Sequence, residues 1–250
     1  MQAEREVLLA RLMGLLLTDG SLSQIKKTKV WRISFISNSV ELVNEFEKLV
    51  YKLYGRKFTK KRYKGAISVK NTISKEFAEE LVSYSPTYRT LSINEKETNA
   101  RIPSFISNNL VLAKEFLRYA FTGDGTIIFN IGKAKYGFRF DRCVKLYSEH
   151  ANLRKQYFEL LRKLNYEPIM LKDAVLLRKP KNLVKFSKEI GFVEGVKISG
   201  NGLWRGIIKK SLLEFAASSY RLRPKQLGKT KDDIHNNLVN LILRSGHQMI

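Results

Sequence analysis

The chain has 250 residues, 44% of them hydrophobic, and carries 46 Lys and Arg against 23 Asp and Glu, a formal net charge of +23. The hydrophobic fraction excludes a disordered basic tail, because it is enough to form a substantial core. The positive charge attracts polyanions, and nucleic acid is the strongest candidate because each neutralised phosphate releases a counterion. Composition alone leaves a cationic ribosomal or membrane-surface protein open.

Cysteine, histidine and hydropathy exclude further classes. The single cysteine, Cys143, excludes an internal disulfide and fits a reducing compartment. The histidines, His150, His235 and His247, lie at no zinc-ligand spacing, which disfavours a zinc nuclease. The apolar run at 12–17 is too short for a membrane span and lacks a signal-peptide cleavage site. We therefore expect an intracellular protein without membrane contact, cytoplasmic, nucleoid-associated, or in an organelle of a eukaryotic cell.

In chain order, the first predicted element is a helix at residues 6–20, and residues 113–125 repeat its pattern. Both stretches are apolar and end in Asp-Gly, where glycine can supply the left-handed conformation that stops a helix. Each has a small residue near its middle, Gly14 or Ala120, which permits close packing. We therefore expect the two helices side by side, with Asp19 adjacent to Asp124.

The segments that follow each of these helices also repeat. The first half continues with a strand, an amphipathic helix, a strand pair and a second helix, at residues 30–36, 37–53, 56–70 and 75–81. The second half repeats this series at residues 137–147, 148–164, 167–178 and 182–190. Ser39 and Asn152 are expected helix caps. The predicted fold class is α+β, with two pseudo-symmetric αββαββα halves. The expected division is 1–103, 104–205 and a mainly helical extension, 206–250, whose role is open.

Alternation along the strands separates an apolar face from a polar face. In the first half, Trp31, Ile33 and Phe35 are expected to point inward and Arg32 outward. In the second half, Phe138 and Phe140 are expected to point inward and Arg139 outward. Two-stranded ribbons fit the DNA major groove, where polar side chains can read base edges. A solvated charged face is the alternative for any single lysine. The expected DNA-binding residues are Lys26, Lys27, Lys29, Arg32, Ser34, Lys61, Arg62, Ser68, Lys70, Lys133, Lys135, Arg139, Asp141, Lys172 and Arg178.

The two aspartates suggest a metal site. Adjacent carboxylates repel each other and resist ionisation, so a divalent cation beside them makes physical sense. The main-chain carbonyls of Thr18 and Gly123 could complete an oxygen site suited to Mg²⁺, and Mn²⁺ is expected to substitute. Such a site supports in-line hydrolysis of a phosphodiester bond. One Asp-Gly alone is an ordinary turn signal, but two copies in a duplicated basic protein are a stronger indication.

These motifs resemble a known family. Residues 12–20 and 117–125 are similar to the nine-residue motif of the LAGLIDADG homing endonucleases, and the resemblance covers roughly residues 5–205. It implies a monomer of the two-motif type, archaeal-intron or intein-like, with both motif helices at the interface of a DNA-binding saddle. The implied activity is Mg²⁺-dependent hydrolysis of both strands of a long, roughly pseudo-palindromic double-stranded DNA site. Asp19 and Asp124 are then catalytic metal ligands, and Lys96 and Lys197 are similar to catalytic lysines of relatives. Tyr119 departs from the small residue usual in the motif.

Two alternatives stay open at the level of sequence. An RNA maturase or DNA-binding regulator could share this fold without cleaving DNA, and its own intron RNA would then be a partner. An intein fragment is disfavoured, because Met1 is no splicing nucleophile and the C-terminal residues lack a His-Asn pair. We expect a free-standing endonuclease with no obligate protein partner. The sequence does not give its DNA target.

Overall fold

The computed structural model describes residues 2–63, 65–88, 99–199 and 202–247. The first half contains α1 (Gln2–Leu16), β1 (Gly20–Gln24), β2 (Trp31–Ser37), α2 (Val40–Tyr54), β3 (Thr59–Tyr63), β4 (Ala66–Ile73) and α3 (Lys75–Tyr84). The second contains a single turn, α4 (Ser104–Ser107), then α5 (Leu110–Asp124), β5 (Gly125–Ala134), β6 (Gly137–Tyr147), α6 (Ala151–Lys163), β7 (Ile169–Met170), β8 (Ala174–Leu177) and α7 (Pro180–Glu189). After these come α8 (Lys209–Ser218), the 3-10 turns η1 (Ser219–Arg221) and η2 (Pro224–Gln226), and α9 (Lys231–His247). The predicted α+β class with two αββαββα halves is confirmed.

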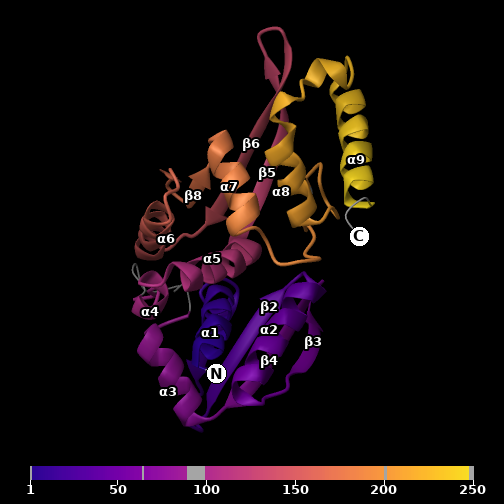
Figure 1. Ribbon diagram of the computed structural model, residues 1–250. Coiled ribbons are helices and arrows are strands. Elements are labelled where there is room, and N and C mark those ends of the chain that lie inside the picture. Colours follow the sequence, from indigo (N-terminus) through magenta and orange to yellow (C-terminus); the bar gives the residue numbers. More distant parts are fainter. Residues whose placement is uncertain (1, 64, 89–98, 200–201, 248–250) are drawn as a thin grey trace.

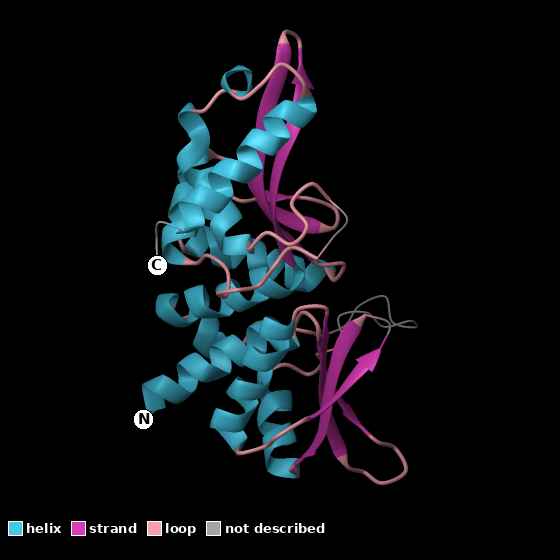
Figure 2. Ribbon diagram, turned by 90° about the vertical axis from the view of Figure 1, so that its right-hand side faces the viewer, coloured by secondary structure: helices cyan, strands magenta, loops and turns pink. Residues whose placement is uncertain are grey.

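Each half has one four-stranded antiparallel sheet, ordered β1-β2-β4-β3 in the first and β5-β6-β8-β7 in the second. Both sheets lie on one side of the molecule, with the helices behind them (Figure 2). Helices α1 and α5 lie at the centre, between the halves (Figure 1). Within the described residues, no helix combines the length and apolar character that a membrane span requires.

The amphipathic helices form where their apolar stripes meet the sheets. In α2, Leu42, Phe46 and Leu49 are buried. Ser39 caps this helix as predicted, since its hydroxyl accepts a hydrogen bond from the Leu42 amide. The predicted cap of α6, Asn152, is wrong. The Nδ1 of His150 accepts from Leu153 instead, and the helix begins one residue before Asn152.

Helices α1 and α5 approach each other through two glycines. A Cβ atom on Gly14 would lie 2.6 Å from the carbonyl oxygen of Phe116, and one on Gly123 would lie 2.5 Å from the Thr18 hydroxyl. Tyr119 is large, but its ring points away from the contact between α1 and α5 and toward α2. Its hydroxyl donates to Glu45 at 2.7 Å. The predicted close packing of the two motif helices is confirmed.

The glycines that follow the two aspartates have a different role from the one predicted. Neither Gly20 nor Gly125 adopts a left-handed conformation, and the φ of Gly125 is −100°. Each instead lies against the last turn of its helix, where the chain turns directly into a strand. A Cβ on Gly20 would lie 2.5 Å from Leu16 Cα, and one on Gly125 would lie 2.8 Å from Phe121 Cα. Glycine is required there for space.

We expect Gly14→Val to destabilise the protein by about 1–3 kcal/mol, as overpacked contacts typically do. For a chain of this size that corresponds to a fall in Tm of roughly 2–4 °C per kcal/mol. The control is Gly202→Val, because a Cβ at Gly202 would meet open space. Thermal unfolding of both variants measures the difference, and equal Tm values would contradict the close helix contact.

Candidate metal site and nucleic-acid interface

The two predicted aspartates lie at adjacent helix ends. Asp124 is the last residue of α5, and Asp19 lies in the turn after α1. Burial raises the pKa of Asp19 to about 6. Burial, together with the charge of Asp19, raises the pKa of Asp124 to about 7. The effect of the Asp19 charge on Asp124 indicates that the two carboxyl groups lie close together, as predicted.

The site offers oxygen ligands and little else. Among the described residues, no group of three or more His, Cys, Asp or Glu side chains could hold a metal ion. Ionisation of both carboxyl groups is unfavourable here, and a divalent cation between them would offset their mutual repulsion. Main-chain carbonyls and waters would complete its shell, in the manner of Mg²⁺. Thr18 and Gly123, the predicted carbonyl ligands, pack against each other where the two helices meet.

Lys209, which the sequence interpretation missed, is the third charged residue of this site. Its buried Nζ donates hydrogen bonds of 2.8 Å to the carbonyl oxygens of Thr122 and Gly125, on either side of Asp124. Burial lowers the pKa of Lys209 to about 8, and the charges of Asp19 and Asp124 oppose that decrease. The ammonium group therefore ties the end of α5 to α8 and partly offsets the two carboxylates.

A sequence signal for Lys209 does exist. The residue lies in the same helical stripe as Leu212, Leu213 and Ala216, all buried in α8. A lysine at the start of an apolar stripe is a candidate for burial against a carboxylate. The repeat pattern does not point to Lys209, because this segment has no counterpart in the first half.

Lys197 lines a cavity that Asp19 and Lys209 also line. This cavity, of about 240 Å³, is lined by Asp19, Thr122, Gly123, Lys197 and Lys209, with the turn that leads into α2. Lys197 is exposed, and its backbone forms a bridge with Ile208 that brings the two segments together. The structure thus brings Lys197 together with Asp19 and Gly123. The other predicted lysine, Lys96, lies outside the described residues.

In the first sheet, most of the predicted DNA-binding residues share one face. Ser34 pairs with Lys70, and Ser68 pairs with Lys61, so these side chains lie in rows across β2, β4 and β3. Arg32 lies on the same face, while the alternate positions Ile33, Phe35 and Val69 are buried. Lys26, Lys27 and Lys29 are exposed in the turn between β1 and β2.

Arg62 does not share that face. It alternates with Lys61 along β3 and pairs with Ile67, so it points to the side of the sheet covered by α2. Its neighbour on that side, Lys60, forms an ion pair with Glu47 of α2. Arg62 therefore lies on the other face of the sheet from Lys61, and its predicted DNA contact stays a prediction. Ser21 and Thr72, which the sequence interpretation did not select, lie opposite Ser34 and Arg32 on the polar face.

In the second sheet, Arg139 and Asp141 lie on the face opposite Phe138 and Phe140, as predicted. Asp141 forms ion pairs with Arg139 at 3.3 Å and with Arg178 at 3.6 Å. The remaining predicted residues of this half are exposed, near the tip of the β5–β6 hairpin or in the loop between β7 and β8: Lys133, Lys135 and Lys172.

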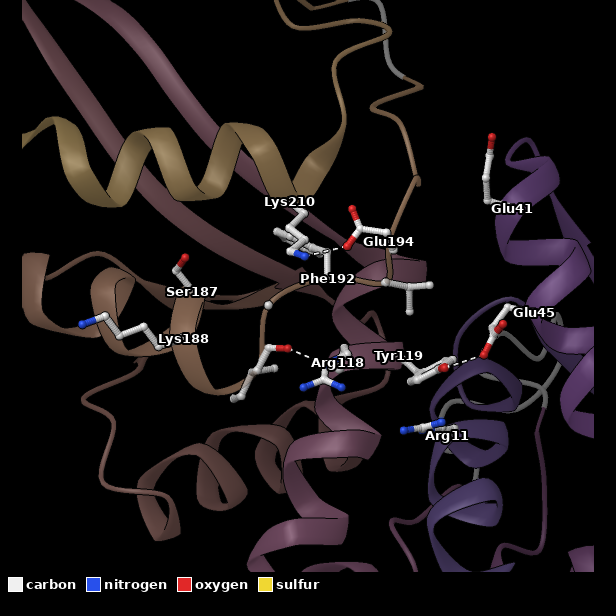
Figure 3. Close-up of a pocket in the computed structure, with 13 residues that line it drawn as sticks. Arg11, Glu41, Glu45, Arg118, Tyr119, Ser187, Lys188, Phe192, Glu194 and Lys210 are labelled. Carbon is white, nitrogen blue, oxygen red and sulfur yellow. Dashed lines mark hydrogen bonds and ion pairs between the residues drawn. The ribbon is translucent and has the colours of Figure 1, made fainter. Parts of the chain in front are cut away.

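A second cavity, of about 540 Å³, lies between the halves (Figure 3). Its polar residues form one contact across the halves and others within the second half. Tyr119 of α5 points to Glu45 of α2, and Arg118 donates to the carbonyl oxygen of Ile190 at 2.6 Å. Lys210 forms an ion pair with Glu194 at 2.6 Å. The contact of Tyr119 with Glu45, and the ion pair of Arg11 in α1 with Glu115 in α5 at 2.7 Å, join the two halves beside the motif helices.

One family model matches the first half of the chain. Residues 6–85 match the family model described as a LAGLIDADG-like domain. The resemblance to LAGLIDADG homing endonucleases is thus confirmed, and the chain has their fold. A comparison with curated proteins finds no significant match.

Three solved structures illustrate the fold. Mesophilic variants of the homing endonuclease I-DmoI have 16% identity, cover 74% of this chain and 91% of theirs, and give a TM-score of 0.53. I-DmoI in complex with DNA and Ca has 16% identity over 74% of this chain and 90% of its own, with a TM-score of 0.52. The meganuclease I-SmaMI bound to uncleaveable DNA has 11% identity over 92% of this chain and 94% of its own, with a TM-score of 0.56.

The pKa values predict how the metal-free protein responds to pH. The folded pKa of Asp124 lies above the unfolded value of about 3.8, so the folded state holds its proton more tightly. The aspartate pair therefore costs stability as pH rises from about 4 to about 7, and the full cost is present above pH 7. We expect Asp124→Asn to raise Tm by several degrees at pH 8 and hardly at all at pH 4.5.

Thermal unfolding in EDTA across this pH range measures the effect. The control is Asp232→Asn, since Asp232 is exposed in the first turn of α9. A Tm gain independent of pH, or a loss at pH 8, would contradict the destabilising pair.

Proposed function

We propose that this protein is a site-specific DNA endonuclease that hydrolyses phosphodiester bonds on both strands of double-stranded DNA with Mg²⁺. The observation that carries the proposal is the pair of half-buried carboxylates at adjacent helix ends, between two sheets that lie on one side of the molecule. The similar structures support it, because I-DmoI is described as a homing endonuclease in complex with DNA and Ca.

In this proposal, Asp19 and Asp124 hold the divalent cation together with the carbonyls of Thr18 and Gly123. A divalent cation bound there would supply a water of lowered pKa and would stabilise negative charge on the phosphate oxygens. Lys197 at the pocket edge is placed to orient water or to offset charge on the phosphate. Lys96 is proposed for the same role in the first half.

The polar sheet faces provide the DNA interface. The rows of Arg32, Ser34, Ser68 and Lys70 in the first half, and Arg139 in the second, are proposed to lie along the grooves of one duplex. Because one chain supplies both halves, we propose that it acts as a monomer. The proposed division is residues 1–103 and 104–205 for the two repeats and 206–250 for the extension. An intracellular location follows from the substrate.

The experiment is a selection of cleaved sequences. Purified protein with Mg²⁺ is incubated with duplexes carrying a 40-bp randomised window, and cleaved ends are ligated and sequenced. The proposal predicts enrichment of one long consensus that is lost with EDTA. DNA bound specifically but left intact in Mg²⁺ and Mn²⁺ would contradict the nuclease and favour a DNA-binding regulator. Specific retention of structured RNA, with no DNA selected, would favour a maturase.

Lys209 is predicted to be a positioning residue for this site. We expect Lys209→Met to slow cleavage by about 10- to 100-fold, as loss of a group that orients metal ligands commonly does. DNA affinity should hardly change, because Lys209 is buried away from the surface. Single-turnover cleavage rates at saturating protein, measured against Mg²⁺ concentration, test this. The control is Lys210→Met, which removes a neighbouring partly exposed lysine paired with Glu194. Equal rates for the two variants would contradict the role.

A further inference from the structure

The two β-ribbons that begin at the aspartates differ in length. Strands β1 and β2 pair from Gly20↔Phe35 to Gln24↔Trp31, five residue pairs. Strands β5 and β6 pair from Gly125↔Leu146 to Ala134↔Gly137, ten residue pairs. At about 3.3 Å per residue, the second ribbon reaches roughly 17 Å farther from the metal site. Its tip projects beyond the rest of the half (Figure 1).

In the part of the chain that the structure describes, no third strand pairs with the outer part of the second ribbon. Strand β8 pairs with β6 only from Val144 to Tyr147. In the first half, by contrast, β4 pairs with β2 along its whole length, from Trp31 to Ser37. A two-stranded hairpin is marginally stable by itself, so the outer part of β5–β6 needs support from another element.

Residues 202–247 provide that support on the inner face of the ribbon. The Trp204 indole donates a hydrogen bond of 2.5 Å to the Phe129 carbonyl oxygen, and the two rings stack at 5.6 Å. The Arg142 guanidinium lies 5.0 Å from the Phe129 ring and 4.8 Å from the Tyr220 ring. It also donates to the Ser219 carbonyl oxygen at 2.7 Å. Arg142 thus joins β6 to the segment after α8.

The opposite face of the ribbon carries polar side chains toward the tip. Asn130 of β5 pairs with Asp141 of β6, and Arg139 follows opposite Gly132. Asn, Asp and Arg are side chains that discriminate base edges in the major groove. Because the inner face is covered, this face is the one available to a duplex.

We propose that the β5–β6 ribbon reads a half-site about five base pairs longer than the one read by β1–β2, given about 3.4 Å per base pair. Residues 202–247 are the support that holds this ribbon against the duplex, and Arg142 is a positioning residue for it. The inference rests on the proposed function and assigns a role to the segment beyond the two repeats.

The sequences selected by cleavage test the asymmetry. The constrained positions should extend about five base pairs farther on one side of the cut, at about one base pair per 3.4 Å of ribbon. Arg139→Ala should relax base preference only at the outer positions of the long side, whereas Arg32→Ala should relax only the short side. Constrained stretches of equal length would overturn this inference and leave the proposed nuclease intact. A selection that yields no cleaved consensus would defeat the proposed function and the inference together.

The support is tested with Arg142→Met, which keeps a long apolar stem and loses the donation to Ser219. Discrimination at the outer positions of the long side should fall about tenfold, while the cleavage rate on the best-matched duplex stays within twofold. The control is Arg154→Met on α6, where Arg154 donates to the Ser148 carbonyl oxygen. Equal loss of discrimination at all positions would show a general structural effect and overturn the positioning role.

Discussion

Replacing Asp19 or Asp124 by Asn is expected to reduce double-strand cleavage by about a thousandfold or more, since a bound metal contributes several kcal/mol to such reactions. DNA binding should change little, because both carboxylates lie within the site between the two sheets and the phosphate contacts lie on the sheet faces. The charge change is also small against a net charge of +23. Single-turnover cleavage and equilibrium binding of the selected duplex measure the two effects separately.

The matched control is Asp141→Asn, because Asp141 also lies near the proposed DNA surface but belongs to an ion-pair cluster with Arg139 and Arg178. We expect this variant to retain cleavage on its best sequence. If the Asp19→Asn, Asp124→Asn double variant cut both strands at the rate of the unaltered protein, the metal site would be wrongly assigned.

DNA affinity is expected to fall steeply with salt. A protein with 6–10 phosphate contacts loses about 10³- to 10⁵-fold in affinity between 50 and 200 mM salt, because each contact releases counterions. The exposed basic residues of the sheets and their turns are sufficient for contacts of this number. Fluorescence anisotropy of a labelled duplex, with the catalytic aspartates replaced, gives the slope of log affinity against log salt.

Charge removal locates the contacts. Replacing Lys26, Lys27 and Lys29 with Gln should lower the slope by about one for each lysine that contacts phosphate. Replacing Lys52 and Lys155, which are exposed on α2 and α6, should leave the slope unchanged. A salt-independent affinity, or equal effects of the two sets, would contradict the proposed sheet interface.

Periodicity explains why much of the fold could be predicted. The stripe of Leu42, Phe46 and Leu49 and the alternation of Ile33 with Arg32 are local patterns, each dictated by one helix or strand packing on one core. The repeated order of these patterns predicted two similar halves. The closeness of Asp19 and Asp124 followed from small residues in both motif helices, and Gly14 makes that contact.

The missed features have separate physical causes. Lys209 donates to the Thr122 carbonyl oxygen, near Asp124, only because α8 packs against β5 and α7. No local pattern reveals that packing. His150 caps α6 because the helix begins at Ala151, two residues earlier than a cap at Asn152 implies. Arg62 was grouped with Lys61 because the basic run in β3 shows no alternation of polar with apolar residues, whereas the two lie on opposite faces of the sheet.

The most direct test of the central claim uses a duplex recovered by selection, labelled on both strands, and incubated with the unaltered protein or the Asp19→Asn, Asp124→Asn variant at equal occupancy. We expect Mg²⁺-dependent breaks in both strands at fixed positions, absent with EDTA and absent in the variant. Breaks that persist in the variant, or that form without a divalent cation, would contradict a metal site built on these two helix ends.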